Sequence, residues 1–275
     1  MYHRTSTLFV LSAMMALAAC AAPTTQNPTF TKAEVRAEAQ EQVKASRLVP
    51  EGFSENKKYN AEELQALAAR LDTVARKVQL AAGGLCTDIS GGRERCIFQV
   101  KFAPNEKGIN AHADGNNVVV YPALIDFARN DNHLAFVIAH EFAHNILHHV
   151  ASQQQNAIGG TLIGTILDVA ASSQGFNTGG QFSQLGGQVG SAQYSQGFEQ
   201  EADYVGLYII ARAGFAIEDA PYFWRAMSAA DPQGIYAEGT HPSNPARFIA
   251  MNKTIDEIHA KQQAGLPLIP NFKQK

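Results

Sequence analysis

Two histidines and a glutamate within five residues have the types and spacing of a metal-dependent hydrolase. They form the run His140-Glu141-Phe142-Ala143-His144, an HExxH pattern inside an apolar stretch. Residues four apart share one face of an α-helix, so His140 and His144 can offer two imidazoles to one ion. Zinc suits two neutral imidazoles and a carboxylate, with water in the remaining position. Glu141 can take a proton from that water and deliver one to a leaving amine.

A third ligand must come from elsewhere, and the residues that follow exclude one class of zinc protease. In the pattern HExxHxxGxxH, Leu147 stands at the glycine position and Val150 at the third histidine. His148 and His149 are misplaced for that pattern, and we expect them near a helix end. A later glutamate is therefore the better candidate for the third ligand.

The later candidates lie in the run Phe198-Glu199-Gln200-Glu201-Ala202-Asp203. In a helix Glu199 and Asp203 share a face, whereas Glu201 lies about 200° around from Glu199. One carboxylate can bind zinc while the other hydrogen-bonds a ligating histidine. We assign Glu199 as the ligand and Asp203 as the histidine partner, and expect Glu201 to face solvent. The alternative is a helix face that is merely charged.

Together with two later motifs, these patterns resemble metallopeptidase family forty-eight. HEFAH and ExxAD are followed by Thr240-His241-Pro242 and then Arg247, and the order of elements fits from about residue 59 to residue 258. The small lipoprotein members of the family are the most similar. The resemblance implies an endopeptidase with one zinc ion per chain, bound by His140, His144 and Glu199, with Glu141 as the base.

The resemblance also implies roles for residues outside the ligand set. It places His241 beside the zinc, where it stabilises an oxyanion or fills the fourth position; the alternative is a loop histidine. Arg247 is expected to pair with Asp203 or a nearby carboxylate, or else to lie at the surface. An edge strand that pairs with extended polypeptide substrates is expected at Asn110, Ala111, His112 and Ala113, although the family usually has phenylalanine where His112 stands.

The beginning of the chain has the pattern of a bacterial export signal. Residues 2–20 are weakly basic, then apolar, and end in Leu17-Ala18-Ala19-Cys20, which resembles a lipobox. This predicts cleavage before Cys20 and its acylation, hence a bilayer anchor; the alternative is an ordinary secretory signal. Ala21, where aspartate commonly retains lipoproteins on the inner membrane, favours the outer membrane, facing the periplasm. Residues 21–30 are expected to form a flexible tether.

Two further cysteines remain for disulfide chemistry. In an oxidising envelope we expect Cys86 and Cys96 to pair across a hairpin or tight loop; the alternative is two buried free thiols.

The periodicity predicts a mostly helical α+β fold, zincin-like, with a small β-sheet beside the active-site helix. Asp131 or Asn132 is expected to cap the active-site helix. The glycine-rich residues 156–197 are expected to form a mobile cover or helical hairpin that gates the site. Helices are predicted at 31–47, from 61 to Gly83-Gly84, after Pro122, and at 133–150, 198–213, 219–230 and 244–263, and strands at 96–102, 109–113 and 118–121.

Composition limits the remaining possibilities. The 275 residues carry a net charge of −3, which opposes nucleic-acid binding. We expect a signal peptide at 1–19, a lipidated tether and helix at 20–58, a peptidase domain at 59–265 and a tail at 266–275. The predicted function is quality control of unfolded or misassembled envelope proteins, in contact with outer-membrane assembly machinery. The alternative is a chaperone or assembly factor with minor proteolysis.

Overall fold

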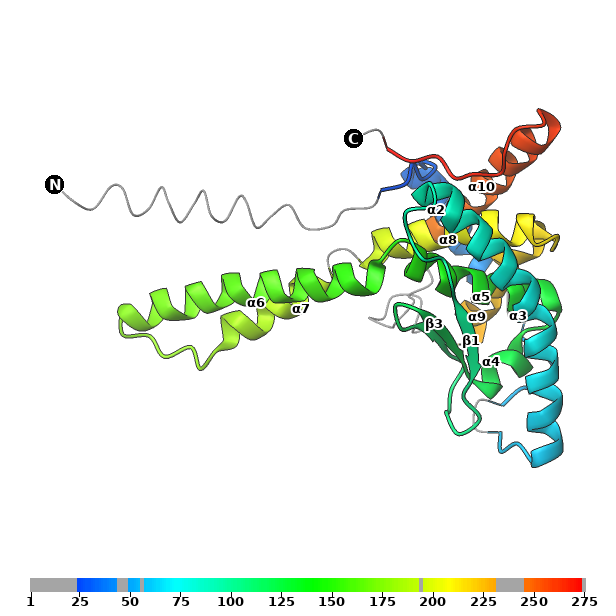
Figure 1. The fold of residues 1–275 in the computed structure, drawn as a ribbon. Helices are drawn as coiled ribbons and strands as arrows, with labels where there is room; N and C mark the ends of the chain where they lie inside the picture. The colour runs from blue at the N-terminus through cyan, green and yellow to red at the C-terminus, as the bar shows by residue number, and fades with distance from the viewer. Residues whose placement is uncertain (1–23, 44–48, 55–56, 193–194, 231–244, 274–275) are drawn as a thin grey trace. The chain divides into compact units, whose positions relative to one another are not determined.

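The computed structural model describes residues 24–43, 49–54, 57–192, 195–230 and 245–273 (Figure 1). They divide into a larger unit, Thr24–Leu147 with Glu199–Lys275, and a smaller one that contains His148–Phe198. The predicted signal segment with Cys20, and the Thr240-His241-Pro242 motif, lie outside the described residues. Among the described helices, none has the length and apolarity needed to cross a bilayer.

The larger unit is mostly helical with one small sheet, which confirms the predicted α+β class. Its central helix α5 contacts α3, α9 and two strands of the sheet (Figure 1). Buried side chains of these elements and of α8 and α10 form one hydrophobic core. The helices are α2 (Lys32–Val43), α3 (Ala61–Ser90), α4 (Pro122–Phe127), α5 (Asp131–Ile146), α8 (Ser195–Arg212), the 3₁₀ turn η2 (Ile217–Asp219), α9 (Ala220–Ala230) and α10 (Pro245–Gln263).

Helix α3 begins where the sequence predicts but continues beyond its predicted end. The Asn60 side chain caps its first turn, and the Glu63 carboxylate accepts a hydrogen bond from the Asn60 backbone N–H. The predicted stop at Gly83-Gly84 is wrong, because the helix runs on to Ser90 and ends at Gly91, which has φ 60°. A Cβ on Gly83 would lie 3.2 Å from the Cys96 carbonyl oxygen, so this glycine permits close packing. Nearby, Cys86 within the helix is bonded to Cys96.

The sheet has three strands in the order β1-β3-β2. Strand β1 (Gln99–Phe102) runs parallel to β3 (Asn117–Val120), whereas β2 (Ala111–Ala113) is antiparallel to β3. The β2–β3 turn is held by Asp114, whose carboxylate accepts hydrogen bonds from the backbone N–H groups of Asn116 and Asn117. Within the sheet, β2 is therefore an edge strand, and it packs against α5.

Helix α5 is buried along almost its whole length, so its motif lies inside the core. Its cap is Asn130, one residue before the predicted Asp131; the Asn130 side chain accepts from His133 N. The helix ends at Ile146, earlier than predicted, because His148 adopts a left-handed conformation with φ 57° and a new helix starts at His149.

The residues before α2 are ordered against the core, which corrects the expectation of a flexible tether for residues 24–30. Thr25 forms an antiparallel bridge with Phe272, and Lys273 N donates to the Thr24 carbonyl at 2.8 Å. Thr25 is 1% exposed. The N-terminal segment and the predicted C-terminal tail therefore pair with each other and form part of the larger unit.

The smaller unit is a helical hairpin, one of the two arrangements predicted for this glycine-rich region. It consists of α6 (His149–Ser173) and α7 (Gln181–Ala192), shown side by side in Figure 1. The helix backbones touch at two glycines: a Cβ on Gly160 would lie 1.9 Å from the Gly186 carbonyl oxygen, and one on Gly164 would lie 1.9 Å from that of Phe182. Larger residues at these positions would force the helices apart.

Candidate metal centre

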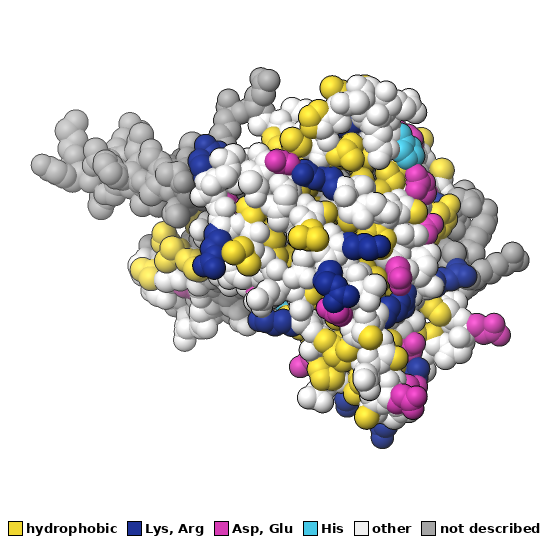
Figure 2. All heavy atoms as spheres, turned by 45° about the vertical axis from the view of Figure 1, so that its right-hand side comes forward, with side chains coloured by type: hydrophobic (Ala, Val, Ile, Leu, Met, Phe, Trp, Pro, Cys, Tyr) yellow, Lys and Arg dark blue, Asp and Glu magenta, His cyan; other side chains and the backbone are white. Residues whose placement is uncertain are grey.

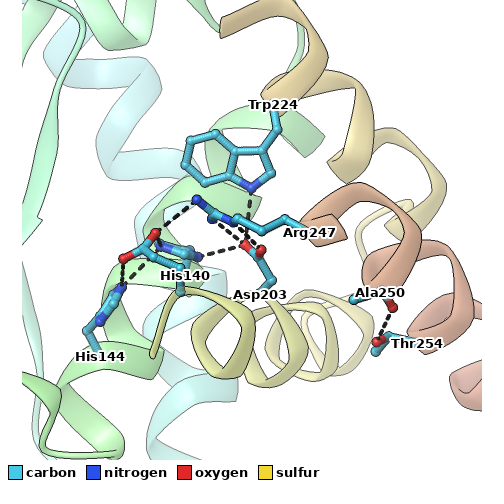
Figure 3. A network of polar contacts seen from close by, with 8 residues as sticks. His140, His144, Asp203, Trp224, Arg247, Ala250 and Thr254 are labelled. Atoms are coloured by element: carbon cyan, nitrogen blue, oxygen red, sulfur yellow. Dashed lines mark hydrogen bonds and ion pairs between the residues drawn. The ribbon is translucent and has the colours of Figure 1, made fainter. Parts of the chain in front are cut away.

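Three buried side chains from two helices converge on one point. His140 and His144 project from one face of α5, and their Nε2 atoms are 3.1 Å apart. Glu199, from the second turn of α8, places Oε2 3.3 Å from His140 Nε2 and Oε1 3.2 Å from His144 Nε2. All three residues are at most 5% exposed. The structure thus brings together the residues that the sequence singled out as ligands. Figure 3 shows the two histidines side by side.

The spacing of these donors fits a small divalent ion. Their ligand atoms all lie within 4.8 Å of one another. Ligands about 2.0–2.1 Å from a tetrahedral ion are separated by about 3.3 Å, close to the three distances here. Two imidazoles and a carboxylate also have the softness that zinc accepts, and they leave one of four positions for water. The residues therefore form a candidate metal site of the open type.

Asp203, one turn beyond Glu199 on α8, faces the other nitrogen of the first histidine. Its Oδ1 lies 3.0 Å from His140 Nδ1. Asp203 also accepts hydrogen bonds from Trp224 Nε1 at 3.1 Å and from Arg247 Nη2 at 2.8 Å and Nε at 2.7 Å (Figure 3). A proton on Nδ1 facing Asp203 leaves the Nε2 lone pair directed at the metal position.

The charges in this cluster shift each other's protonation. Burial lowers the pKa of His140, but the adjoining Asp203 and Glu199 carboxylates outweigh it and raise that pKa to about 9. Burial raises the pKa of Asp203, but the Arg247 charge and hydrogen bonds more than offset this and hold it below its ordinary value. Without metal, His140 would therefore carry a second proton at neutral pH, which metal binding must displace.

Arg247 is a central member of the cluster, not the surface residue that the sequence left open. It comes from the first turn of α10, is 1% exposed, and its Nη1 lies 2.9 Å from Glu199 Oε2. Its guanidinium carbon lies 4.3 Å from the centre of the Trp224 ring. Although burial lowers the pKa of Arg247, the charges of Asp203, Glu199 and Glu141 raise it. Arg247 thus neutralises buried carboxylates that would otherwise repel one another.

Glu141 follows His140 on α5 and is 2% exposed. Its contribution to the raised pKa of Arg247 places its charge within the same electrostatic cluster. Its role as a base remains a prediction.

The predicted substrate strand lies against α5, the helix that carries His140 and His144. Ala111 is buried and pairs with Val120, and the Asn110 carbonyl accepts from Tyr121 N at 3.1 Å. His112 makes an edge-on contact with the Tyr121 ring, with ring centroids 5.9 Å apart. Since Ala113 is the last residue of β2, residues 110–113 run along the edge of the sheet.

Sequence reasoning missed three residues that position the site. Asn145, directly after His144, accepts from Gly115 N at 2.8 Å and donates to the Asn117 carbonyl at 3.0 Å, which ties the β2–β3 turn to α5. Trp224 Nε1 donates a hydrogen bond to Asp203, and Gly206 allows α8 to approach α5 closely. In a sequence, an asparagine beside a motif or a glycine within a helix does not indicate such contacts. Trp224 could have been singled out, because it is the only tryptophan of the chain.

The expectation that Glu201 faces solvent is wrong. It is 1% exposed, and its Oε1 accepts from Thr25 N at 2.6 Å and from Thr25 Oγ1 at 2.9 Å. The helical rotation was correct, but the opposite side of α8 is covered by the N-terminal segment. His148 and His149 lie at a helix end as expected, because α6 begins at His149. His149 is buried there and stacks on Phe198, with ring centroids 4.3 Å apart.

Comparison with known proteins agrees with this geometry. Residues 54–255 match peptidase family M48. Over 134 residues, or 46% of this chain and 28% of the relative, the chain is 36% identical to a beta-barrel assembly-enhancing protease of Yersinia pestis. It is 29% identical to the mitochondrial metalloendopeptidase OMA1 of Schizosaccharomyces pombe over 170 residues, which are 58% of this chain and 49% of the relative. The matches thus span between about a quarter and a half of these relatives.

Proposed function

The chain belongs to peptidase family M48, and from that premise we propose that it is a zinc-dependent endopeptidase. The observation that carries the proposal is the convergence of His140, His144 and Glu199 at spacings that suit a tetrahedral ion. An open position in such a site suits hydrolysis, whereas a structural zinc site is closed by four protein ligands.

The chain's own residues supply the remaining chemistry. Bound zinc would lower the pKa of water to about 7 and polarise the scissile carbonyl. Glu141 accepts the proton of the attacking water and passes a proton to the leaving amine. Asp203 holds His140 with Nε2 toward the metal, and Arg247 holds Asp203 and Glu199 in place. His241 is proposed to stabilise the oxyanion.

The proposed substrates are polypeptides in extended conformation. The edge of β2 offers backbone groups at residues 110–113 to a substrate strand, and β2 packs against the helix that carries the metal ligands. Backbone pairing of this kind recognises unfolded or unassembled chains with little dependence on sequence.

The proposed setting is the bacterial envelope. The lipobox-like sequence ending at Cys20 supports an acyl anchor at the outer membrane, facing the periplasm. The similarity to a beta-barrel assembly-enhancing protease supports quality control of outer-membrane proteins. The assembly-enhancing role of that relative also favours a second candidate, assistance to assembly with only minor cleavage.

Glu141→Gln tests the chemistry because it removes the base while leaving the three ligands. We expect casein cleavage to fall by about 10²–10⁴-fold with zinc content unchanged. Glu62→Gln, an exposed change in the first turn of α3, is the matched control and should cleave like the parent. A chelator should abolish cleavage in the parent, and zinc should restore it. Undiminished cleavage by a zinc-loaded Glu141→Gln protein would refute the proposed mechanism.

The same variant separates cleavage from assembly. If Glu141→Gln is expressed in cells that lack the protein, a protease predicts that envelope defects persist. Full rescue by this variant would instead make binding the main function.

A further inference from the structure

The hairpin of α6 and α7 exposes a continuous row of large apolar side chains. Ile158, Leu162, Ile166 and Val169 follow one another at steps of four, four and three residues, so they share one face of α6. They are 61%, 50%, 43% and 65% exposed. We call this row the apolar stripe; isolated exposed apolar residues are ordinary, but a contiguous row is typical of a binding surface.

The partner helix does not cover the stripe. Helix α7 packs against α6 at Gly160 and Gly164, where the backbones touch. Each of these glycines follows a stripe residue by two positions, which is about 200° around the helix. The stripe therefore lies on the side of α6 opposite α7.

The hairpin is almost free of charge. Residues 149–198 contain one acidic residue, Asp168, and no lysine or arginine. Asp168 is engaged within the hairpin, where its carboxylate accepts from Thr178 Oγ1 at 2.5 Å and from Ser183 N at 2.9 Å. Elsewhere, the face seen in Figure 2 shows basic and acidic side chains interspersed. The uncharged polar side chains of the hairpin are mainly glutamine, serine and threonine, and further apolar side chains are exposed at Leu167, Phe182 and Leu185.

We propose that the α6–α7 hairpin binds the surface of a lipid bilayer by laying its apolar stripe into the boundary between headgroups and acyl chains. An exposed apolar stripe on an uncharged helix takes its binding free energy from apolar burial, without attraction to anionic headgroups. Close backbone contact at small residues is also the packing that holds two helices together in lipid, where the hydrophobic effect does not drive their association.

Chain length allows the hairpin to reach a bilayer. Cys20 precedes the docked Thr24 by four residues, so an acyl anchor there would hold the larger unit within about 14 Å of the membrane. Helix α6, with 25 residues, spans about 37 Å. This step rests on the proposed acylation, whereas the stripe and its lack of charge do not.

A tryptophan in the stripe reports insertion locally. Ile166→Trp is compared with Leu80→Trp, which lies on α3 in the larger unit at a site 80% exposed. Both changes are made in the full chain with Cys20→Ser, which prevents acylation. The probe is a small phosphatidylcholine vesicle with brominated acyl chains, which quench nearby indoles. The native Trp224 is buried and gives the same background in both proteins.

We expect quenching of the indole at position 166 and none at position 80. It should not depend on added anionic lipid or on high salt, because charge does not drive it. Leu162→Ser should weaken vesicle binding about tenfold or more, and Val169→Ser provides a second test if the first variant is not folded.

Protein that floats with vesicles while position 166 stays unquenched would overturn the proposal, as would quenching that requires anionic lipid. A dimer that Leu162→Ser dissociates would assign the stripe to a second copy of the chain instead. Because no peptide is cleaved in this assay, its outcome is independent of the proposed peptidase activity.

Discussion

Arg247→Met removes a buried cation while keeping an unbranched apolar side chain of similar reach. In the parent protein, the Arg247 guanidinium donates two hydrogen bonds to Asp203 and forms an ion pair with Glu199. It also lies against the Trp224 ring. Methionine can preserve the contact with Trp224 but none of the polar ones. Two buried carboxylates then face each other without the charge that neutralised them.

The cost follows from burial. Removing one partner of a buried ion pair typically costs about 3–5 kcal/mol, because the other charge is left unpaired. Arg247 is 1% exposed and Asp203 1%, so solvent screening reduces this figure little. For a chain of this size, the melting temperature should fall by roughly 10 °C. A divalent ion beside Glu199 restores part of the lost positive charge, so the loss should be smaller with zinc than in chelator.

Urea unfolding followed by circular dichroism measures this difference, in chelator and with saturating zinc. Arg76→Met is the matched control: it breaks an ion pair with Asp72 on α3 whose side chains are 62% and 63% exposed. Exposed pairs contribute about 0–1 kcal/mol. If both variants lose the same stability in chelator, the buried cluster does not depend on Arg247 as argued.

Three further changes test other parts of the structure. Gly206→Ala places a Cβ 3.2 Å from the His140 backbone, so α8 must move away from α5. We therefore expect several-fold weaker zinc affinity, measured by chelator competition. The free energy of unfolding should change little, because alanine favours the helix by about 1 kcal/mol and offsets the cost of the movement. Glu201→Gln weakens charge-assisted bonds to residues 24 and 25 by about 1–2 kcal/mol, seen as faster hydrogen exchange there; unchanged exchange would count against it. The contact with Lys253 and hydrogen bonds to Thr31 lower the pKa of Glu34 to about 2 from 4.5, so its contribution to α2 docking is complete above pH 4.5 and lost toward pH 2. Glu34→Gln should flatten that dependence, measured by hydrogen exchange in α2.

The geometry of each pair of candidate ligands was predictable because it is local. His140 and His144 need only one helix, and Glu199 and Asp203 need only another, so helical geometry fixes each pair. The meeting of the two pairs is a tertiary event, which the sequence indicated through the missing third ligand and through resemblance to a family. The helix boundaries near His148 and beyond Gly83 depended on a left-handed residue and on close packing, and neither is encoded in hydrophobic periodicity.

The errors at residues 24–30 and at Glu201 have one cause. A stretch of small and polar residues is typical of a tether, and a glutamate opposite a ligand is typical of a solvent-facing position. Each is buried only because the other covers it: the Thr25 N–H and hydroxyl satisfy the carboxylate, and the carboxylate satisfies them. Single-residue tendencies cannot reveal a pairing between positions 176 residues apart.

This pairing makes the N-terminal segment part of the support of the candidate metal centre. Along α8, Glu199 and Asp203 point toward α5 and α10, while Glu201 points about 200° away and is fixed by Thr24 and Thr25. The helix is thus held by charged hydrogen bonds on both sides, which resists rotation about its axis. Rotation would carry Glu199 away from the two histidines, so contacts made by residues before the first helix bear directly on the geometry of the ligands.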